Sequence, residues 1–382
     1  MSSLTSRERV ILALNHQEPD CVPLDLGGTP WSTMIVPAYE RLKEYLGLKH
    51  ETKLLLKRPQ SVVPDDAVLD RLNIDFVGLN LGEFRGGSGR ELDAYTLVDA
   101  WGTTWKKAPG GHYINVDGPF QKRDPKLEIL ETHEWPDPND PGLFDGLGEK
   151  AAQLRKNSDR AIVLGLPVGI VHHCQFLRGY SEWLIDLLEN PEYACSMMDI
   201  VADIWIKIAE NALDATGDNV DVVAWGDDVA IQESTLMSPG TYRELVKPRH
   251  KRMVQAIKSR CSAKIHFHSC GSVYAIVEDL IDIGIDALNP IQVSAQNMDP
   301  PTLKREFGDR LTFWGGIDTQ QVLPYGSPRD VREEVRYTID CLGPGGGYVL
   351  AGVHNLQGDV PPENVVAMFE EGRKYGLYQH VP

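Results

Sequence analysis

The residues of this chain best suited to bind a metal ion lie in "KIHFHSCGSV", residues 264–273, where His268 and Cys270 stand two positions apart. Imidazole and thiolate are ligands that zinc prefers in proteins. If the apolar residues before them form a strand, both side chains point to the same side of it. His354 follows a later apolar run and is the third candidate ligand. Three protein ligands would leave one position of a zinc ion for a substrate, whereas the plainer alternative is the polar end of a strand.

The same spacing of histidine and cysteine occurs a second time, at His172 and Cys174 in "VHHCQFLRG", residues 171–179. This stretch is expected to start a helix, where positions i and i+2 point to different faces. We therefore expect a structural or pocket-lining role for it, with His172 placed to contact a substrate.

Candidate acid and base groups lie within two of the apolar runs. Asp227 and Asp228 end "VDVVAWGDD", residues 220–228, and adjacent carboxylates can bind a cation, orient a ligand or act as a base. The alternative for this pair is a cap for the next helix. His266 should share the facing of His268, and a core histidine with one hydrogen bond is favoured over a further metal ligand. Asp228, Asp227 and His266 are the candidate catalytic residues.

Neutral and acidic side chains at the ends of other runs are candidates for substrate contacts: Asn80, Asn289, Gln292 and Asp318, together with His172 past the third run. Turn formation explains several of them equally well, especially in "NP" at 289–290 and "GGID" at 315–318. Trp225, with Trp31 and Trp101, is a candidate wall of an aromatic pocket, and core packing is the alternative.

These residues need a scaffold, and the chain alternates short apolar runs with helical patterns. The runs cover residues 21–28, 74–80, 161–167, 220–228, 263–271, 285–292, 311–318 and 347–355. Eight strands alternating with helices predict an α/β fold, a TIM-like (β/α)8 barrel, and a doubly wound sheet is the alternative. In a barrel all the reactive strand ends meet on one face. Residues 1–382 are expected to form one domain.

One stretch departs from this rhythm. Residues 93–116 alternate with a period near two and contain "PGG", which predicts a β-hairpin inserted after the second strand. We expect it either to cover the barrel mouth or to decorate the surface.

Composition narrows the class of protein. The 382 residues carry a net charge of −17, which opposes binding to nucleic acid and to anionic membranes. Six scattered cysteines without a C-x-x-C pair indicate a reduced environment. Neither a signal-peptide pattern at the N-terminus nor an apolar stretch of about 18 residues is found. A cytoplasmic protein is expected.

Several motifs resemble the uroporphyrinogen decarboxylase superfamily. They are "HFHSCGSV" (266–273), "ALNPIQVSA" (287–295), "FWGGID" (313–318) and "PGGGYVLAGVHNLQGDVPPENV" (344–365). The resemblance covers nearly the whole chain and implies a TIM-like barrel. It also implies one of two chemistries, which are decarboxylation without metal or cofactor, and zinc-dependent methyl transfer to or from cobalamin on a small corrinoid protein.

The resemblance favours the methyltransferase branch. The decarboxylase branch binds its carboxylate-rich substrate with arginines just after the first strand, but "LDLGGTPWSTM", residues 24–34, contains none. The methyltransferase branch holds zinc with an H-x-C pair, matched by His268 and Cys270, and a later cysteine. That cysteine lies nine residues before the position of Glu363, where this chain has His354. The decarboxylase branch also has histidine there, so this position leaves the metal open.

The sequence therefore predicts a zinc methyltransferase with His268, Cys270 and His354 as ligands. Its partners would be a small methyl donor or acceptor, a methyl ether or a thiol, and the cobalamin of a corrinoid protein. Relatives suggest a homodimer. One alternative is a metal-free decarboxylase or lyase acting on a smaller carboxylate, with His268 and His354 as acid and base. Another is a non-catalytic protein that binds a corrinoid or other ligand.

Overall fold

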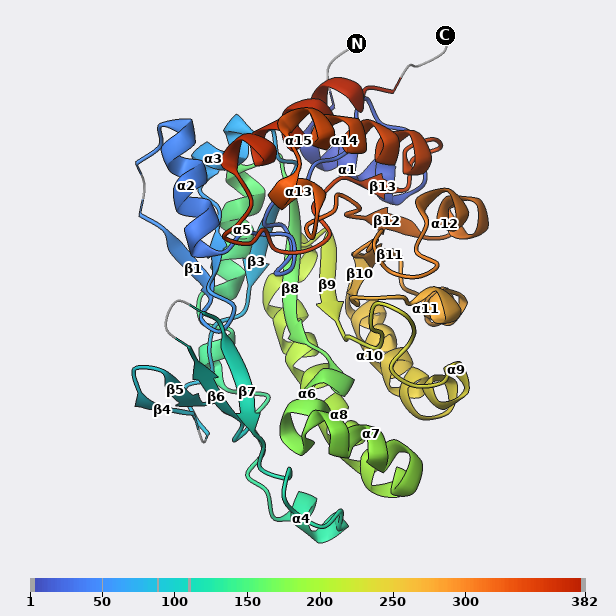
Figure 1. Cartoon of the computed structure of the whole chain (residues 1–382). Helices are drawn as coiled ribbons and strands as arrows, with labels where there is room; N and C mark the ends of the chain where they lie inside the picture. Colours follow the sequence, from blue (N-terminus) through green and yellow to red (C-terminus); the bar gives the residue numbers. More distant parts are fainter. Residues whose placement is uncertain (1–3, 50, 88, 109–110, 379–382) are drawn as a thin grey trace.

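A computed structural model describes residues 4–49, 51–87, 89–108 and 111–378. Its centre is a curled, seven-stranded parallel sheet in the order β13-β12-β11-β10-β9-β8-β3 (Figure 1). The strands are β3 (Phe76–Asn80), β8 (Ala161–Val168), β9 (Val222–Gly226), β10 (Lys264–His268), β11 (Ala287–Asn289), β12 (Thr312–Trp314) and β13 (Tyr348–Val349). Each strand pairs with the strand of this sheet that comes next in the sequence, which is the arrangement of a TIM-like fold.

The first predicted strand, at residues 21–28, is not formed as a strand. The segment makes one parallel bridge, between Leu24 and Leu350 beyond β13, and Leu24 also accepts a hydrogen bond from the Asp75 amide beside β3. It therefore lies between the two edge strands of the sheet. Pro23 has no amide hydrogen, and the Leu24 amide donates to the Asp75 carboxylate instead of to a strand. A regular ladder cannot form with these two donors missing.

Helices cover the outside of the central sheet, as the alternation of the sequence predicts (Figure 1). Thr5 and Ser327 form capping boxes at the starts of α1 (Ser6–Leu14) and α14 (Pro328–Leu342). The longer helices are α1 (Ser6–Leu14), α2 (Val36–Leu46), α3 (Asp66–Arg71), α5 (Leu147–Asn157), α6 (Ile170–Arg178), α7 (Tyr180–Glu189), α8 (Pro191–Thr216), α10 (Lys247–Arg260), α11 (Val277–Ile283), α12 (Pro300–Phe307), α14 (Pro328–Leu342) and α15 (Pro362–Tyr375).

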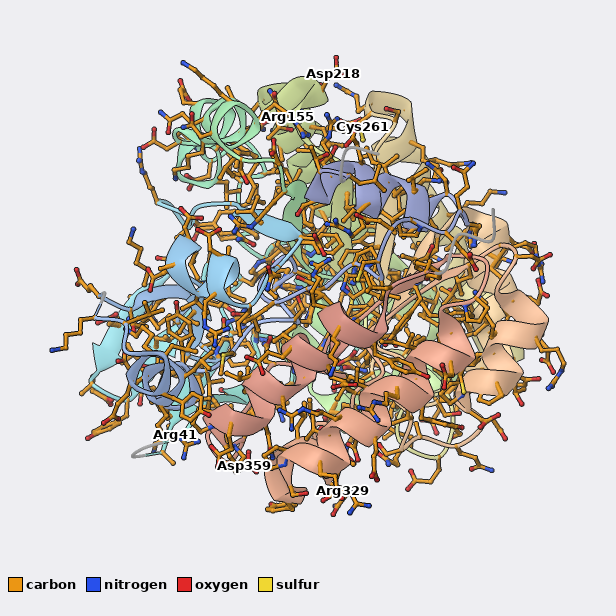
Figure 2. All side chains as sticks on the ribbon, turned by 90° about the horizontal axis from the view of Figure 1, so that it is seen from above. Arg41, Arg155, Asp218, Cys261, Arg329 and Asp359 are labelled. Carbon is orange, nitrogen blue, oxygen red and sulfur yellow. The ribbon has the colours of Figure 1, made fainter. Side chains whose placement is uncertain are left out.

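Shorter helical pieces connect these elements. They are α4 (Leu127–Glu131), α9 (Pro239–Thr241), α13 (Val322–Tyr325), three 3₁₀ turns at Pro141–Leu143, Gly217–Asn219 and Tyr274–Ile276, and a π-helical turn at Tyr242–Val246. Charged side chains project from the outer rim of the molecule, as Arg41, Arg329 and Asp359 do in Figure 2. Among the described residues, no helix combines the length and apolar character needed to cross a membrane.

The predicted hairpin at residues 93–116 is part of a larger antiparallel sheet. Its four strands are β4 (Arg90–Asp93), β5 (Thr96–Val98), β6 (Thr104–Lys107) and β7 (Tyr113–Asp117), and residues 109–110 of the predicted hairpin lie outside the described residues. A separate pair is formed by β1 (Lys53–Leu56) and β2 (Ser61–Val63). The ring of Trp105 in β6 lies 4.7 Å from that of Phe176 in α6, so this sheet packs against the helix that carries His172.

Asp75 links three parts of the chain that are distant in sequence. Its buried carboxylate accepts hydrogen bonds from Arg9 in α1 at 2.7 Å, from the Leu24 amide at 2.9 Å and from Arg373 in α15 at 2.9 Å. We expect Asp75→Asn to lower the free energy of unfolding by about 2 kcal/mol, because charge-assisted hydrogen bonds are lost from a buried site. Urea unfolding measures this difference. Asp124→Asn, at an exposed pair with Lys126, is the control and should change it by less than about 0.5 kcal/mol.

Candidate metal centre

The fold brings the three predicted metal ligands together. His268 ends β10, Cys270 follows two residues later, and His354 lies in the loop after β13. One ligand atom from each residue lies within 4.8 Å of the other two, and His268 Nε2 is 3.5 Å from Cys270 Sγ. A tetrahedral zinc ion with nitrogen and sulfur ligands sets its ligand atoms roughly 3.5 Å apart. The donor types and their spacing therefore fit a zinc ion after a small movement of the side chains.

The register of the central sheet explains the position of His268. In the pairing of β9 with β10, His268 lies opposite Gly226, and a Cβ at Gly226 would come within 2.7 Å of the His268 Cβ. The absent side chain leaves room for Trp31, whose ring stacks on the His268 imidazole at 4.6 Å with an angle of 8° between the planes. Trp31, a candidate for the aromatic pocket in the sequence, thus holds the plane of the imidazole.

A second glycine turns the chain after Cys270. Gly271 has φ +90°, and a Cβ there would lie 2.4 Å from the carbonyl oxygen of Ile231. Only glycine combines that backbone conformation with so close an approach. The Gly271 amide donates to Gln292 Oε1 at 2.7 Å, and Gln292 Nε2 donates to Gln232 at 3.0 Å. Gln292, predicted to contact substrate, therefore holds the loop that follows Cys270.

The charge states of the cluster suit metal ligands. Burial lowers the pKa of His268 to about 4, against the opposing influence of Asp228, and burial also lowers the pKa of His354. Both imidazoles are consequently neutral near pH 7, the form that binds metal. Burial, with a smaller effect of Asp228, raises the pKa of the Cys270 thiol well above its ordinary value. A thiol in this state is a poor free nucleophile, and a cation beside it would be needed to remove its proton.

Asp228 lies beside this cluster. Its Oδ1 accepts a hydrogen bond from the Cys270 amide at 2.8 Å and is 3.8 Å from His268 Nε2, and its Oδ2 is 3.8 Å from His172 Nδ1. Burial opposes its charge, but His268, His172 and the Cys270 amide together lower its pKa. A carboxylate is therefore held next to the three candidate ligands and beside His172, which was predicted to contact substrate.

Asp227 has a different place from its neighbour. Its buried carboxylate accepts hydrogen bonds from the Val171 and His172 amides, at 2.7 and 2.8 Å, and lies 3.0 Å from His250 Nε2. The structure thus uses it at the first turn of α6, a helix that precedes it in the chain, and not as the predicted cap of the next helix. Tyr242 OH contacts His250 Nδ1 at 3.2 Å and completes this buried chain of polar groups.

His266 lies inside the curled sheet, on the same side of β10 as His268. It is fully buried, its ring meets that of Trp314 edge-on at 4.9 Å, and burial lowers its pKa to about 3. Within the described part of the chain neither ring nitrogen has a hydrogen-bond partner, whereas the sequence predicted one bond. The three-residue cluster does not include His266.

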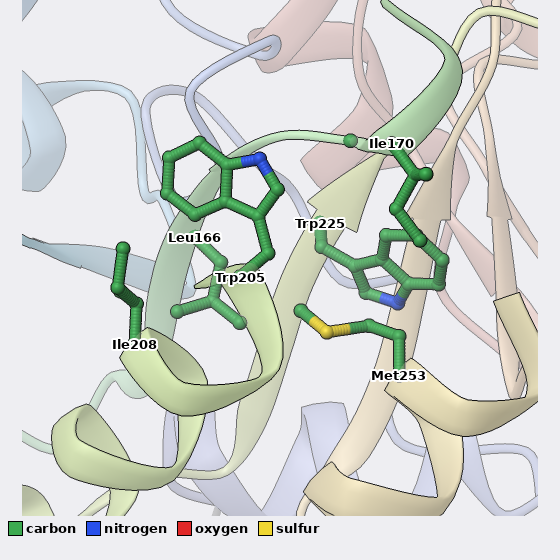
Figure 3. Close-up of a pocket in the computed structure, with 7 residues that line it drawn as sticks. Leu166, Ile170, Trp205, Ile208, Trp225 and Met253 are labelled. Atoms are coloured by element: carbon green, nitrogen blue, oxygen red, sulfur yellow. The ribbon is translucent and has the colours of Figure 1, made fainter. Parts of the chain in front are cut away.

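Trp225 lies away from the cluster of His268, Cys270 and His354. It lies opposite Phe267 in the register of β9 and β10, so it faces away from the side that carries His268. It lines a small apolar pocket between the sheet and the helices outside it (Figure 3). The other lining residues are Leu166, Gly169, Ile170, Trp205, Ile208 and Met253. Its position matches the core-packing alternative.

Of the remaining residues predicted to contact substrate, one lies at the metal-ligand cluster and two have other contacts. Asn289 lies at the cluster, with Oδ1 2.6 Å from His268 Nδ1. Asp318 accepts from the Gln320 amide at 2.7 Å and so stabilises a turn, as its alternative proposed. The half-buried Asn80 ends β3, where its Oδ1 faces the position that a side chain at Gly165 would take. Asp318 does not belong to the metal-ligand cluster.

His250 is a supporting residue that the sequence motifs did not single out. It lies in the first turn of α10, in "KPRHKRM", and no spacing links it to Asp227. One signal was present, because Val246, His250, Met253 and Ile257 share the buried face of this helix. A histidine at an apolar position of a helix needs a buried partner, and here the partner is Asp227.

The sequence is similar to those of methyltransferases and of uroporphyrinogen decarboxylases. The methylcobamide:CoM methyltransferase MtaA of Methanosarcina barkeri strain Fusaro is 26% identical over 98% of this chain and 99% of that protein. A second MtaA sequence from this species is 26% identical over 59% of this chain and 62% of that protein. A uroporphyrinogen decarboxylase from Methylococcus capsulatus is 33% identical over 75% of this chain and 79% of that protein.

A solved structure of a methyltransferase from Methanosarcina mazei shares the fold. It has a TM-score of 0.67 at 20% identity and covers 98% of this chain and 99% of that one. The family model described as Uroporphyrinogen decarboxylase (URO-D) matches residues 96–375, which is well over half of the chain. This chain therefore belongs to the uroporphyrinogen decarboxylase family.

Proposed function

We propose that this protein is a zinc-dependent methyltransferase that moves a methyl group between a small substrate and the cobalamin of a corrinoid protein. The observation that carries the proposal is Cys270, placed with His268 and His354 so that one ligand atom of each lies within 4.8 Å of the others. Metal-free decarboxylation has no need of a thiol there. The match to MtaA, named as a methylcobamide methyltransferase, over nearly the full length of both chains supports the same branch.

His268, Cys270 and His354 would hold the zinc ion. When bound, zinc would supply Lewis acidity, either to the oxygen of a methyl ether or to a thiol acceptor. A site with two imidazoles and one thiolate is harder than a site with two thiolates, which favours a substrate that presents oxygen to the zinc ion. The name of MtaA includes CoM, which favours a thiol substrate instead. We therefore propose that both methyl ethers and thiols be tested as substrates.

The neighbouring residues would serve the substrate and its proton. Asp228 keeps a negative charge, and its two carboxylate oxygens lie 3.8 Å from His268 Nε2 and from His172 Nδ1. It would take the proton of a thiol substrate or orient an ether, with His172 as a second polar group beside it. Phe176, whose ring lies 4.5 Å from that of His172, and Trp105 of β6 behind it would exclude water from that side.

The metal-free decarboxylase is the second candidate, because the Methylococcus capsulatus relative carries that name. Residues 24–34 of this chain weigh against a substrate with many carboxylates. They are buried apart from the half-buried Gly27, and the Asp25 carboxylate accepts from the Gly28 amide and from Trp314 Nε1, both at 2.8 Å. This segment offers no cationic side chain to a substrate.

The proposed activity can be measured with free cobalamin in place of the corrinoid protein. With methylcobalamin and a thiol, or with cob(I)alamin and a methyl ether, we expect the cobalamin absorbance to change in the presence of zinc-loaded protein. Removing the metal with a chelator should abolish the change, and adding zinc back should restore it. Methyl transfer at full rate by metal-free protein, or carbon dioxide release from a small carboxylate by that protein, would contradict the proposal.

A further inference from the structure

We propose that Asn289 is a positioning residue that keeps the proton of His268 on Nδ1 and so directs the lone pair of Nε2 toward the metal. The metal part of this inference rests on the proposed function, whereas the position of the proton does not. The sequence made Asn289 a candidate for substrate contact, with turn formation as the alternative. In the structure, both the oxygen and the nitrogen of its side-chain amide form hydrogen bonds within the protein instead.

The orientation of the Asn289 amide follows from its two partners. Its Nδ2 lies 3.1 Å from the main-chain oxygen of Trp314, which can only accept a hydrogen bond. Nδ2 is therefore the nitrogen, and the atom 2.6 Å from His268 Nδ1 is the amide oxygen. An amide oxygen has no proton to give. His268 Nδ1 must therefore carry the hydrogen of this bond.

The consequence lies at the other end of the imidazole ring. In a neutral imidazole one nitrogen donates and the other accepts, so a proton on Nδ1 leaves Nε2 with its lone pair. Nε2 is the atom 3.5 Å from Cys270 Sγ. Histidine ligands in metal sites commonly donate their second N–H to an oxygen acceptor, and Asn289 provides that acceptor here.

The sheet itself builds this contact. Asn289 ends β11 and lies directly opposite His268 in the register of β10 and β11, and its own main-chain oxygen accepts from the Ser269 amide at 2.8 Å. Trp314, the partner of Nδ2, is fixed in turn by its indole N–H, which donates to Asp25. Neighbouring strands thus hold the amide on one edge of the imidazole while Trp31 lies on its face.

Two substitutions separate the hydrogen bond from the shape of the side chain. Asn289→Leu keeps a similar volume but offers no acceptor, and we expect it to weaken zinc binding about 10- to 100-fold in competition with a chromophoric chelator. Asn289→Asp keeps an oxygen that can accept from Nδ1–H, and its zinc affinity should stay within a few-fold of the wild type or increase. Circular dichroism spectra and thermal unfolding check that both variants fold.

Nitrogen NMR of the imidazoles in zinc-free protein gives a second readout. The signals of His268 are identified by their loss in His268→Gln, and the wild type should show the Nδ1–H tautomer at this residue. Asn289→Leu should populate both tautomers, and Asn289→Asp should restore one. A wild-type Nε2–H tautomer, or unchanged zinc affinity in folded Asn289→Leu, would overturn the role of Asn289. If the wild type binds no zinc, the proposed function fails, and the tautomer spectrum still decides where the His268 proton lies.

Discussion

Cys270→Ser is expected to lose its equivalent of bound zinc, with zinc affinity reduced on the order of a thousandfold. The reason is the charge of the ligands. His268 and His354 are neutral donors, so the thiolate of Cys270 would be the one anionic ligand among the three. A serine hydroxyl does not ionise near neutral pH, and it is a harder and weaker donor. Metal analysis of protein purified without chelator, followed by chelator competition, measures both quantities.

Cys261→Ser is the matched control for this substitution. Cys261 is a free, half-buried cysteine at the end of α10, three residues before β10, and its Sγ contacts the Ile257 carbonyl rather than the cluster. The zinc content and the methyl-transfer rate of the Cys261→Ser variant should match those of the wild type. If Cys270→Ser keeps one zinc and full methyl transfer, the His-Cys-His site is wrong. If neither protein binds zinc while both remain active, the metal-free chemistry becomes the better explanation.

The order of the strands could be predicted because the apolar runs and helical patterns alternate so regularly. Seven of the eight predicted runs contain strands of the central sheet, and the parallel register brings His268 and Asn289 side by side. The first run could not be distinguished from the others by its apolar pattern. Its failure to form a ladder depends on Pro23, which has no amide hydrogen, and on a distant partner, because Asp75 takes the Leu24 amide that a strand would have used.

The facing of single residues was harder to predict than the order of the strands. β9 is buried on both sides, so Ala224 and Trp225 are both apolar and no alternation indicates which one faces inward. The histidines of β10 settle the question only through the register, in which His266 pairs with Ala224 and Phe267 with Trp225. A pairing between strands about forty residues apart in sequence cannot be obtained from either strand alone.

The doublet of Asp227 and Asp228 gives the largest expected effect on stability. Asp227→Ala should lower the free energy of unfolding by about 3–5 kcal/mol. The substitution leaves two backbone amides of α6 and the buried ring of His250 without a hydrogen-bond acceptor. Asp228→Ala removes one hydrogen bond, from the Cys270 amide, at a side chain that is 31% exposed, and should cost about 1 kcal/mol. Urea unfolding of the two variants measures the difference.

Activity should rank the same two variants in the opposite order. Asp228→Ala removes the carboxylate beside His268 and His172 and should reduce methyl transfer strongly while the protein remains folded. For Asp227→Ala, activity measured well below its unfolding temperature should fall less, since the carboxylate touches the start of α6 and not the cluster. Equal loss of stability in both variants would contradict the separation of roles. A folded Asp227→Ala that binds zinc but is less active than Asp228→Ala would place Asp227 in the chemistry after all.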